Sequence, residues 1–329
     1  FFAFEDVVDK GEASAYKDWF YGLKFPVRRP ETGEEYPEYE GFGYERMMPK
    51  TNTENPEVIE YFCKVGQYWV REFGIDGWRL DVASEINDAF WRRFREAVKA
   101  VKRDCLLIGE VWESAQHWLS GDMFDSTMNY DFRKHCRRFF AEHSIDAAQF
   151  DGRVTNMRMR YKLPVLYGQL NLLDSHDVSR FLSLCKNDLA SMKLAVLFQM
   201  TFIGIPSVFY GDEKGLDGLL EEEYRHPMPW GESGGELEQF YRDAIRLRNT
   251  CPELRQGDYH TTYAQKGSGL YCYCRSSDKG KIFILLNNQA QAAKLPAELT
   301  EGTLLWQEGL EGQTLTPMGF AVFRKVTGA

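Results

Sequence analysis

The sequence is poor in the features that would assign it to nucleic acid or to a membrane. Its lysines and arginines form no dense cluster, and its 329 residues carry a net charge of −9, which argues against a track for a phosphate backbone. No apolar run is long enough to span a bilayer. Neutral small-molecule substrates therefore fit better than nucleic acid or membrane partners. An initiator methionine is also lacking, so we expect the native start to lie elsewhere.

Cysteine and histidine are present without an ordered pattern. The seven cysteines are odd in number and scattered, which argues against a disulfide framework. Cys272 and Cys274 share one face of a strand-like run, but no second pair or nearby histidine gives the spacing of a metal site. We therefore predict reduced core cysteines, no metal ligands and a cytoplasmic protein. The histidines without clustered partners are expected to be surface or core residues: His117, His135, His143, His226 and His260.

Alternating segments follow from about Glu57 onward. Their composition, with 43% hydrophobic and 15% aromatic residues in the whole chain, is sufficient for a large core and a second, smaller domain. Helical and strand-like segments alternate, as in βα units around a parallel sheet. Helices are predicted over 88–101 and 189–202. The predicted strands lie in IDGWRLDV, CLLIGEV, FDSTMNY, LYGQLNLLDSHD and IPSVFYGDE.

The last 80 residues have a different pattern. After a helix predicted over 236–248, GLYCYCRSSDKGKIFILLNN indicates an antiparallel hairpin, and GFAVFRK indicates a closing strand. We predict a partial (β/α)8 barrel domain over 1–250, which includes an N-terminal excursion, and a small antiparallel β-sandwich domain over 251–329. Only five parallel strands are recognisable, whereas a (β/α)8 TIM barrel needs eight. Residues 1–56 are predicted to form a long excursion, with the first barrel strands before it.

Three carboxylates close predicted strands, at Asp81, Glu110 and Asp177. The carboxyl ends of barrel strands converge on one cavity, and consecutive βα units would bring Asp81 and Glu110 together. Two facing carboxyl groups are what glycoside hydrolysis needs, one as nucleophile and one as proton donor. Arg79, on the same face as Asp81, would hold the nucleophile ionised. The alternative is a structural ion pair in a strand that we expect to be buried.

Several motifs carry a resemblance to a known family. GWRLDVASE, GEVW and LLDSHD resemble the second, third and fourth sequence regions of the alpha-amylase superfamily, and GIPSVFYGDEKGLDG resembles the segment on the last barrel strand. MPKTNTENPEV, FDSTMNYDF and YRHPMPW are similar to the neopullulanase, cyclomaltodextrinase and maltogenic amylase subgroup. Leucine is usual in that subgroup at the place of Thr51.

The resemblance implies a role for each matching residue. Asp81 would be the nucleophile, Glu110 the general acid/base, and Asp177 a third carboxylate that binds sugar hydroxyls. Arg79 would be the partner of Asp81, and His176 a hydrogen-bond donor to the sugar at the cleavage site.

Further residues are implied around this centre. Trp112 would be a wall of the acceptor side, although an ordinary core position is the alternative. Ser84 and Glu85 stand where an Asn-Glu pair usually touches the acceptor sugar, so Ser84 is a departure that leaves the balance of hydrolysis and transfer open. Arg225 and Asp212 would support the far rim of the site.

The first region of the superfamily, Asp-x-x-x-x-Asn-His, has no match. The resemblance therefore implies the C-terminal two-thirds of an enzyme, without the first three barrel strands and an N-terminal β domain. It implies retaining hydrolysis, with some transfer, of α-1,4 bonds in maltooligosaccharides, cyclomaltodextrins or pullulan, and some α-1,6 cleavage. No organic cofactor is implied, while calcium and a homodimeric parent are left open. The alternatives are another specificity of the superfamily, such as an oligo-1,6-glucosidase or a starch α-amylase, or an inactive sugar-binding fragment.

Overall fold

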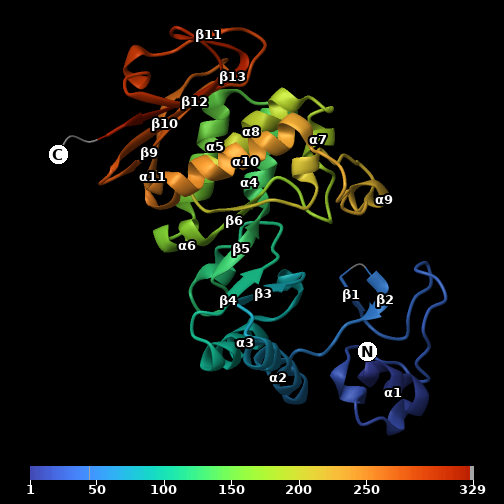
Figure 1. Cartoon of the computed structure of the whole chain (residues 1–329). Coiled ribbons are helices and arrows are strands. Elements are labelled where there is room, and N and C mark those ends of the chain that lie inside the picture. Colours follow the sequence, from blue (N-terminus) through green and yellow to red (C-terminus); the bar gives the residue numbers. More distant parts are fainter. Residues whose placement is uncertain (44, 327–329) are drawn as a thin grey trace. The chain divides into compact units, whose positions relative to one another are not determined.

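The computed structural model describes residues 1–43 and 45–326, which form two compact units (Figure 1). The first unit comprises Phe1–Val111 and Ala115–Thr127. The second comprises Trp112–Ser114 and the described residues from Met128 onward. Within the described ranges, we find no helix with the length and apolar character needed to cross a membrane.

The predicted excursion at the start of the first unit has a small core of its own. Helix α1 (Phe2–Lys10) precedes two 3-10 turns, η1 (Gly11–Ala13) and η2 (Lys17–Trp19), and a hairpin of β1 (Gly41–Phe42) and β2 (Glu45–Pro49). The apolar residues of this segment bury one another together with the start of the following helix: Ala3, Phe4, Val7, Trp19, Phe20, Val27, Tyr39 and Val58.

Two helices and the first parallel strands complete the unit. Helix α2 (Pro56–Phe73) starts at the Asn55 cap and ends at left-handed Gly74, and α3 (Asp88–Val101) starts at the Asn87 cap. Gly66 of α2 leaves room for Phe94 of α3, since a Cβ there would lie 2.6 Å from that ring. Strand β3 (Gly77–Leu80) is followed by the 3-10 turn η3 (Ala83–Glu85), and strand β4 (Leu106–Gly109) is followed by the 3-10 turn η4 (His117–Leu119). β3 pairs in parallel with β4, and β4 with the first half of β5 (Ser126–Asn129).

The second unit continues the parallel pairing. The second half of β5 pairs with β6 (Leu170–Leu172), and β6 pairs with β7 (Ile205–Ser207). The helices of this part are α4 (Tyr130–Cys136), the π-helical η5 (Arg137–Ala141), α5 (Ala147–Met159), α6 (Leu163–Gly168), α7 (Phe181–Leu184), α8 (Leu189–Thr201), η6 (Asp212–Lys214), α9 (Glu221–Tyr224), α10 (Gly235–Thr250) and α11 (Pro252–Gln256).

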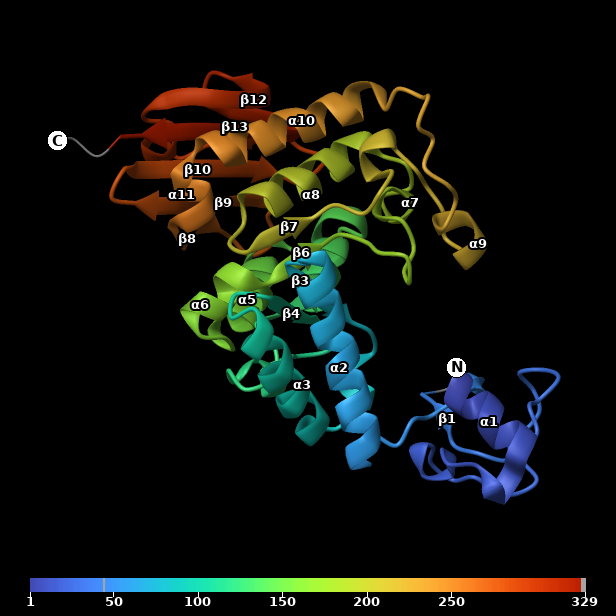
Figure 2. The ribbon, with the colours of Figure 1, turned by 60° about the horizontal axis from the view of Figure 1, so that its bottom comes forward.

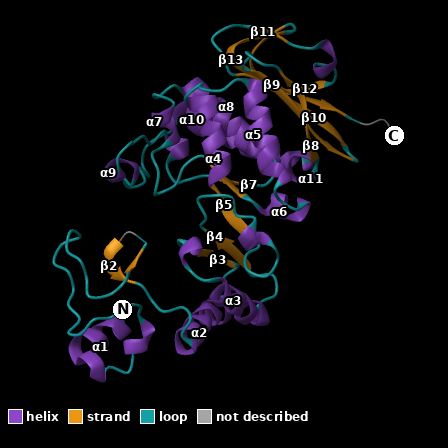
Figure 3. Ribbon diagram, turned by 180° about the vertical axis from the view of Figure 1, so that it is seen from behind, coloured by secondary structure: helices purple, strands orange, loops and turns teal. Residues whose placement is uncertain are grey.

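An antiparallel sheet ends the second unit. Strands β8 (Asp258–Ala264), β9 (Leu270–Ser277), β10 (Gly280–Asn287), β13 (Thr314–Lys325) and β11 (Ala293–Lys294) follow one another across it, and β12 (Thr303–Glu311) pairs with β13. Helices α5, α8 and α10 lie against this sheet (Figures 2 and 3). One apolar core unites them. The opposite face is covered by residues near β11 and the short helix η7 (Ala297–Leu299).

Several predictions are confirmed at the level of elements. The five parallel strands, the antiparallel sheet and the two helices near 88–101 and 189–202 are present. Six of the seven cysteines are buried as predicted, whereas Cys63 is half-buried. The described C-terminal strands form one sheet rather than two facing sheets, and helices occupy the place of a second layer on one face. The boundary at 250/251 stays a prediction.

Candidate active site

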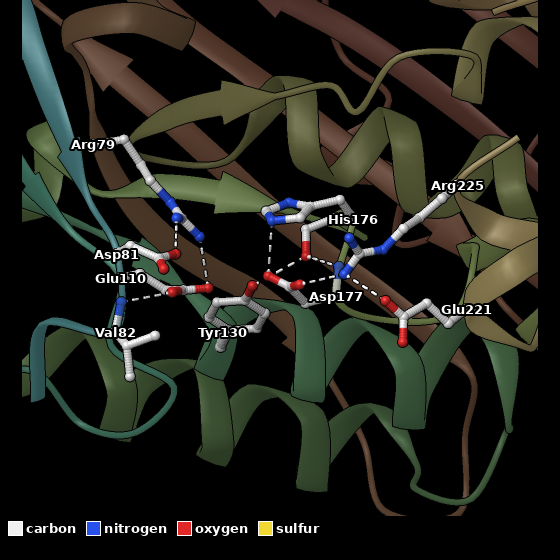
Figure 4. Close-up of polar contacts among 10 residues, drawn as sticks. Arg79, Asp81, Val82, Glu110, Tyr130, His176, Asp177, Glu221 and Arg225 are labelled. Atoms are coloured by element: carbon white, nitrogen blue, oxygen red, sulfur yellow. Dashed lines mark hydrogen bonds and ion pairs between the residues drawn. The ribbon is translucent and has the colours of Figure 1, made fainter. Parts of the chain in front are cut away.

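Arg79 joins two of the predicted carboxylates in the first unit. It projects from β3 and forms an ion pair with Asp81, the residue that follows the strand (Figure 4). Its Nη2 lies 2.7 Å from Oε1 of Glu110, which follows the neighbouring strand β4. The guanidinium therefore touches both carboxylates, and two negative groups can lie close together because a permanent cation lies between them.

Glu110 is held more tightly than Asp81. Its side chain is only 2% exposed, and besides Arg79 it accepts a hydrogen bond of 2.9 Å at Oε2 from the backbone N–H of Val82. Val82 has the left-handed backbone conformation φ 41°, ψ 48°, which is rare for a β-branched residue. Both carboxylate oxygens of Glu110 thus have a fixed donor.

The prediction of a fully buried β3 is wrong. The side chains of Arg79 and Asp81 are 33% and 70% exposed. The reason is that β3 is an outer strand, paired on one side with β4 in the part of the chain that the structure describes. The burial cost that a structural ion pair would have to offset is therefore absent at Asp81.

The third predicted carboxylate lies in the second unit, in the loop after β6. Asp177 accepts a hydrogen bond of 3.0 Å from Arg225, and Nε2 of His176 lies 3.1 Å from its other oxygen (Figure 4). Arg225 also pairs with Glu221, four residues earlier on α9, at 3.0 Å. Asp177, His176 and Arg225 are half-buried or exposed, so they can reach a ligand in solvent.

Trp112 has an exposed aromatic face in the same unit. It is 53% exposed, and its ring stacks on Tyr130 with a centroid distance of 4.5 Å and an interplanar angle of 12°. The Tyr130 hydroxyl lies 3.0 Å from that of Ser175. The alternative that Trp112 is an ordinary core residue is therefore wrong, and a rigid exposed ring of this kind suits the apolar face of a sugar.

Glu85, one of the predicted acceptor residues of the first unit, contacts the Met-Pro-Lys segment. Ser84 and Glu85 are exposed in η3, and Nζ of Lys50 lies 3.5 Å from Glu85. Lys50 of the Met-Pro-Lys motif, which indicated the subgroup, therefore lies beside the Ser84-Glu85 pair, in which Ser84 departs from the asparagine usual in that subgroup.

Asp212 is buried, in contrast to the rim position expected for it. It is 4% exposed and pairs at 3.0 Å with Arg180, which is fully buried. Burial raises the pKa of the Asp174 carboxyl, and burial together with the charge of Asp174 raises the pKa of Asp212 well above its ordinary value.

Sequence reasoning missed several residues that contact the predicted ones. Glu221 stands four residues before Arg225, a helical spacing that could have indicated the pair. No sequence signal indicated Val82, because its contact is made by a backbone N–H. None indicated Arg180 either, because this side chain bonds to carbonyls about 30 to 45 positions away in the sequence. Within the described ranges, no group of three or more histidine, cysteine, aspartate or glutamate side chains could hold a metal ion.

Comparison with known proteins assigns this arrangement to a class. The family model described as the alpha amylase catalytic domain matches residues 1–246. The chain therefore belongs to the alpha-amylase catalytic domain family.

Several relatives of this family are similar to most of the chain. Neopullulanase 2 of Thermoactinomyces vulgaris is 44% identical over 317 residues, which cover 95% of this chain and 53% of that protein. A cyclomaltodextrinase of Bacillus sp is 43% identical over 287 residues, covering 87% and 51%. The structure of the native debranching enzyme of Nostoc punctiforme has a TM-score of 0.90 at 33% identity and covers 99% of this chain and 73% of that one. The chain spans about half the length of the curated relatives it matches.

Proposed function

We propose that the chain carries the catalytic carboxylates of a retaining glycoside hydrolase that cleaves α-1,4 bonds in maltooligosaccharides, cyclomaltodextrins or pullulan, with some α-1,6 cleavage and sugar transfer. The observation that carries the proposal is Arg79, whose guanidinium contacts the exposed Asp81 and the buried Glu110 at once. The names of the relatives support the substrate class, since they are a neopullulanase and a cyclomaltodextrinase.

The proposed reaction has two steps. The carboxylate of Asp81 attacks the anomeric carbon, while Glu110 protonates the glycosidic oxygen that leaves, and a covalent glucosyl-enzyme forms. Glu110 then removes a proton from water, or from a sugar hydroxyl in transfer, the oxygen so activated bonds to the anomeric carbon, and the bond to Asp81 breaks, which releases its carboxylate. Arg79 orients the Asp81 carboxylate for the attack and again contacts this carboxylate when the ester breaks. Adjacent carboxylates that share one cation suit this mechanism, because retaining enzymes need their two carboxyl groups close together.

The remaining residues are proposed to bind the glucan. Asp177 and His176 would hydrogen-bond hydroxyls of the sugar at the cleavage site, with Arg225 holding Asp177. Trp112 would stack on the acceptor sugar, and Ser84 and Glu85 would contact it from η3. Asp212 is proposed to support the loop after β7 rather than to touch substrate, since it is buried against Arg180.

We also propose that the parallel strands belong to a (β/α)8 barrel over residues 1–250, followed by a C-terminal β domain over 251–329. The outer strand β7 carries an exposed apolar side chain, Ile205, which is 43% exposed, and this supports a further strand beside it. A cytoplasmic location is proposed from the seven free thiols. Calcium binding and a homodimeric parent stay predictions.

Product analysis tests the proposal. The chain is incubated with β-cyclomaltodextrin, pullulan and maltohexaose beside its Asp81→Asn variant and the control Asp76→Asn, which removes a 95% exposed carboxylate that pairs with Lys102. We expect ring opening to maltose and glucose, lost in Asp81→Asn and kept in Asp76→Asn. Equal products from both variants would overturn the assignment of Asp81.

A second candidate is a non-catalytic sugar-binding fragment. The exposed Trp112 ring and the polar group around Asp177 favour binding without turnover if the first barrel strands are required for chemistry. Binding of maltohexaose by calorimetry with no product from any of the three substrates would favour this candidate.

A further inference from the structure

The chain leaves the regular strand geometry directly after Asp81. Up to that point β3 and β4 form a regular parallel ladder, with Leu80 opposite Gly109, and the N–H of Glu110 donates to the carbonyl of Leu80 at 2.8 Å. In an uninterrupted parallel ladder, the N–H two residues further along β3, that of Val82, would donate to the carbonyl of Glu110. Instead the N–H of Ala83 does so, at 3.1 Å. One extra residue is therefore inserted at this point, as in a β-bulge.

The inserted residue gives Val82 N–H a new partner. Because the ladder position has passed to Ala83, this N–H points to the side chain of Glu110 and donates to Oε2 at 2.9 Å (Figure 4). The turn needs a left-handed backbone at Val82, with φ 41°. Valine adopts this conformation at a cost, since its branched Cβ crowds the backbone, and such strain persists only where the surroundings impose it.

The surroundings hold the bulge from both sides. Leu80 and Ala83 are both bonded to the backbone of Glu110, and the carbonyl of Ala83 accepts a bond of 2.9 Å from the indole of Trp91, which is buried on α3. The position of the Val82 amide is therefore fixed relative to β4. Its partner is equally restricted, since Glu110 is 2% exposed and its other oxygen is bound by Arg79.

We propose that Val82 is a positioning residue for Glu110: the one-residue bulge after β3 turns its amide onto the carboxylate and fixes the orientation of the proton donor toward the glycosidic oxygen. The role in the reaction rests on the function proposed above, whereas the hydrogen bond does not. The side chain of Val82 contributes nothing to the contact, so glycine, which adopts the left-handed conformation freely, preserves it.

Amide hydrogen exchange in the 329-residue chain tests the contact. Glu110→Ala removes the acceptor of this hydrogen bond. We expect exchange of the Val82 amide to become about tenfold faster, because one hydrogen bond to a charged group is lost. The Ala83 amide is the internal control, because it donates to the backbone carbonyl of Glu110, which the substitution keeps. Exchange at Val82 that does not change, or that rises equally at Ala83, would overturn the proposal.

Kinetics separate positioning from mere stability. Val82→Gly keeps the N–H and is expected to retain kcat within about threefold, while replacing Val82 by its α-hydroxy analogue, which substitutes an ester oxygen for the N–H, lowers kcat about tenfold with KM unchanged. Equal kcat in the ester variant would contradict the role in the reaction. A wild-type chain without turnover would contradict the proposed function, and the exchange result would still decide the hydrogen bond.

Discussion

At the scale of single residues, Arg79 explains how two carboxylates share a small space. Asp81 is exposed and Glu110 is buried, yet both contact the same guanidinium. Different surroundings for two neighbouring carboxyl groups are what separate a nucleophile from a proton donor. The assignment of these roles stays a prediction that the kinetics of single variants can test.

A buried histidine gives a pH dependence of stability. Burial lowers the pKa of His135 from 6.5 to about 4. Between these values the unfolded chain binds a proton that the folded chain does not, so the free energy of unfolding falls as the pH falls through this window. We expect His135→Gln to reduce the loss of stability between pH 7 and pH 5 by about 1–2 kcal/mol.

Urea denaturation at the two pH values measures this difference. The control is His226→Gln, which makes the same substitution at an exposed position. An identical acid loss in wild type and His135→Gln would contradict the burial of a neutral imidazole at this position.

At the scale of elements, Arg180 connects the loops that carry the residues of the second unit. Its Nε donates to the carbonyl of Tyr224 at 3.1 Å and its Nη1 to the carbonyl of Tyr210 at 2.6 Å, and Nη1 also pairs with Asp212. Three residues before it stands Asp177, and next to Tyr224 stands Arg225, the partner of Asp177. One buried guanidinium thus holds both ends of that ion pair in place.

Removing this guanidinium should be costly. Arg180→Met leaves Asp212 buried without its cation and two carbonyls without a donor, so we expect the free energy of unfolding to fall by about 3–5 kcal/mol. The control is Arg242→Met on α10, whose side chain is 64% exposed beside Glu238, and which should change stability by less than about 1 kcal/mol. Urea denaturation measures the free energy of unfolding of both variants, and equal losses of stability would contradict the role given to Arg180.

The elements were more predictable than their connections. The helix over 88–101 was placed correctly because its apolar residues share one face, and the pairing of β3 with β4 followed from consecutive βα units. The burial of Asp212 and the roles of Val82 and Arg180 depend on backbone groups brought together by folding, which side-chain patterns do not encode. The exposure of the β3 side chains depends on which strands flank β3, and a local sequence pattern does not show this.

At the scale of the whole molecule, the outer strand β7 and the helix α10 of the second unit each expose an apolar side chain. Ile205 on β7 and Ile245 on α10 are 43% and 41% exposed. An outer strand with apolar neighbours can pair with another chain. We expect the 329-residue chain to self-associate with rising concentration and Ile205→Lys with Ile245→Lys to shift it toward the monomer.

Light scattering at several protein concentrations checks this expectation. Leu219→Lys, at a 56% exposed loop position, is the control and should associate as the wild type does. A wild-type chain that stays monomeric over the whole concentration range would show that this surface is not a site of association.

If Asp81 forms the covalent bond to the sugar, covalent trapping places an adduct on its carboxylate. The chain is treated with 5-fluoro-α-glucosyl fluoride, which forms the glucosyl-enzyme readily and releases it slowly, and is then analysed by intact mass and peptide mapping. We predict one added hexosyl group on the peptide that contains Asp81, absent in Asp81→Asn and present in Asp76→Asn. Turnover of glucan with no adduct, or with an adduct on another carboxylate, would contradict the assignment of Asp81 as the nucleophile.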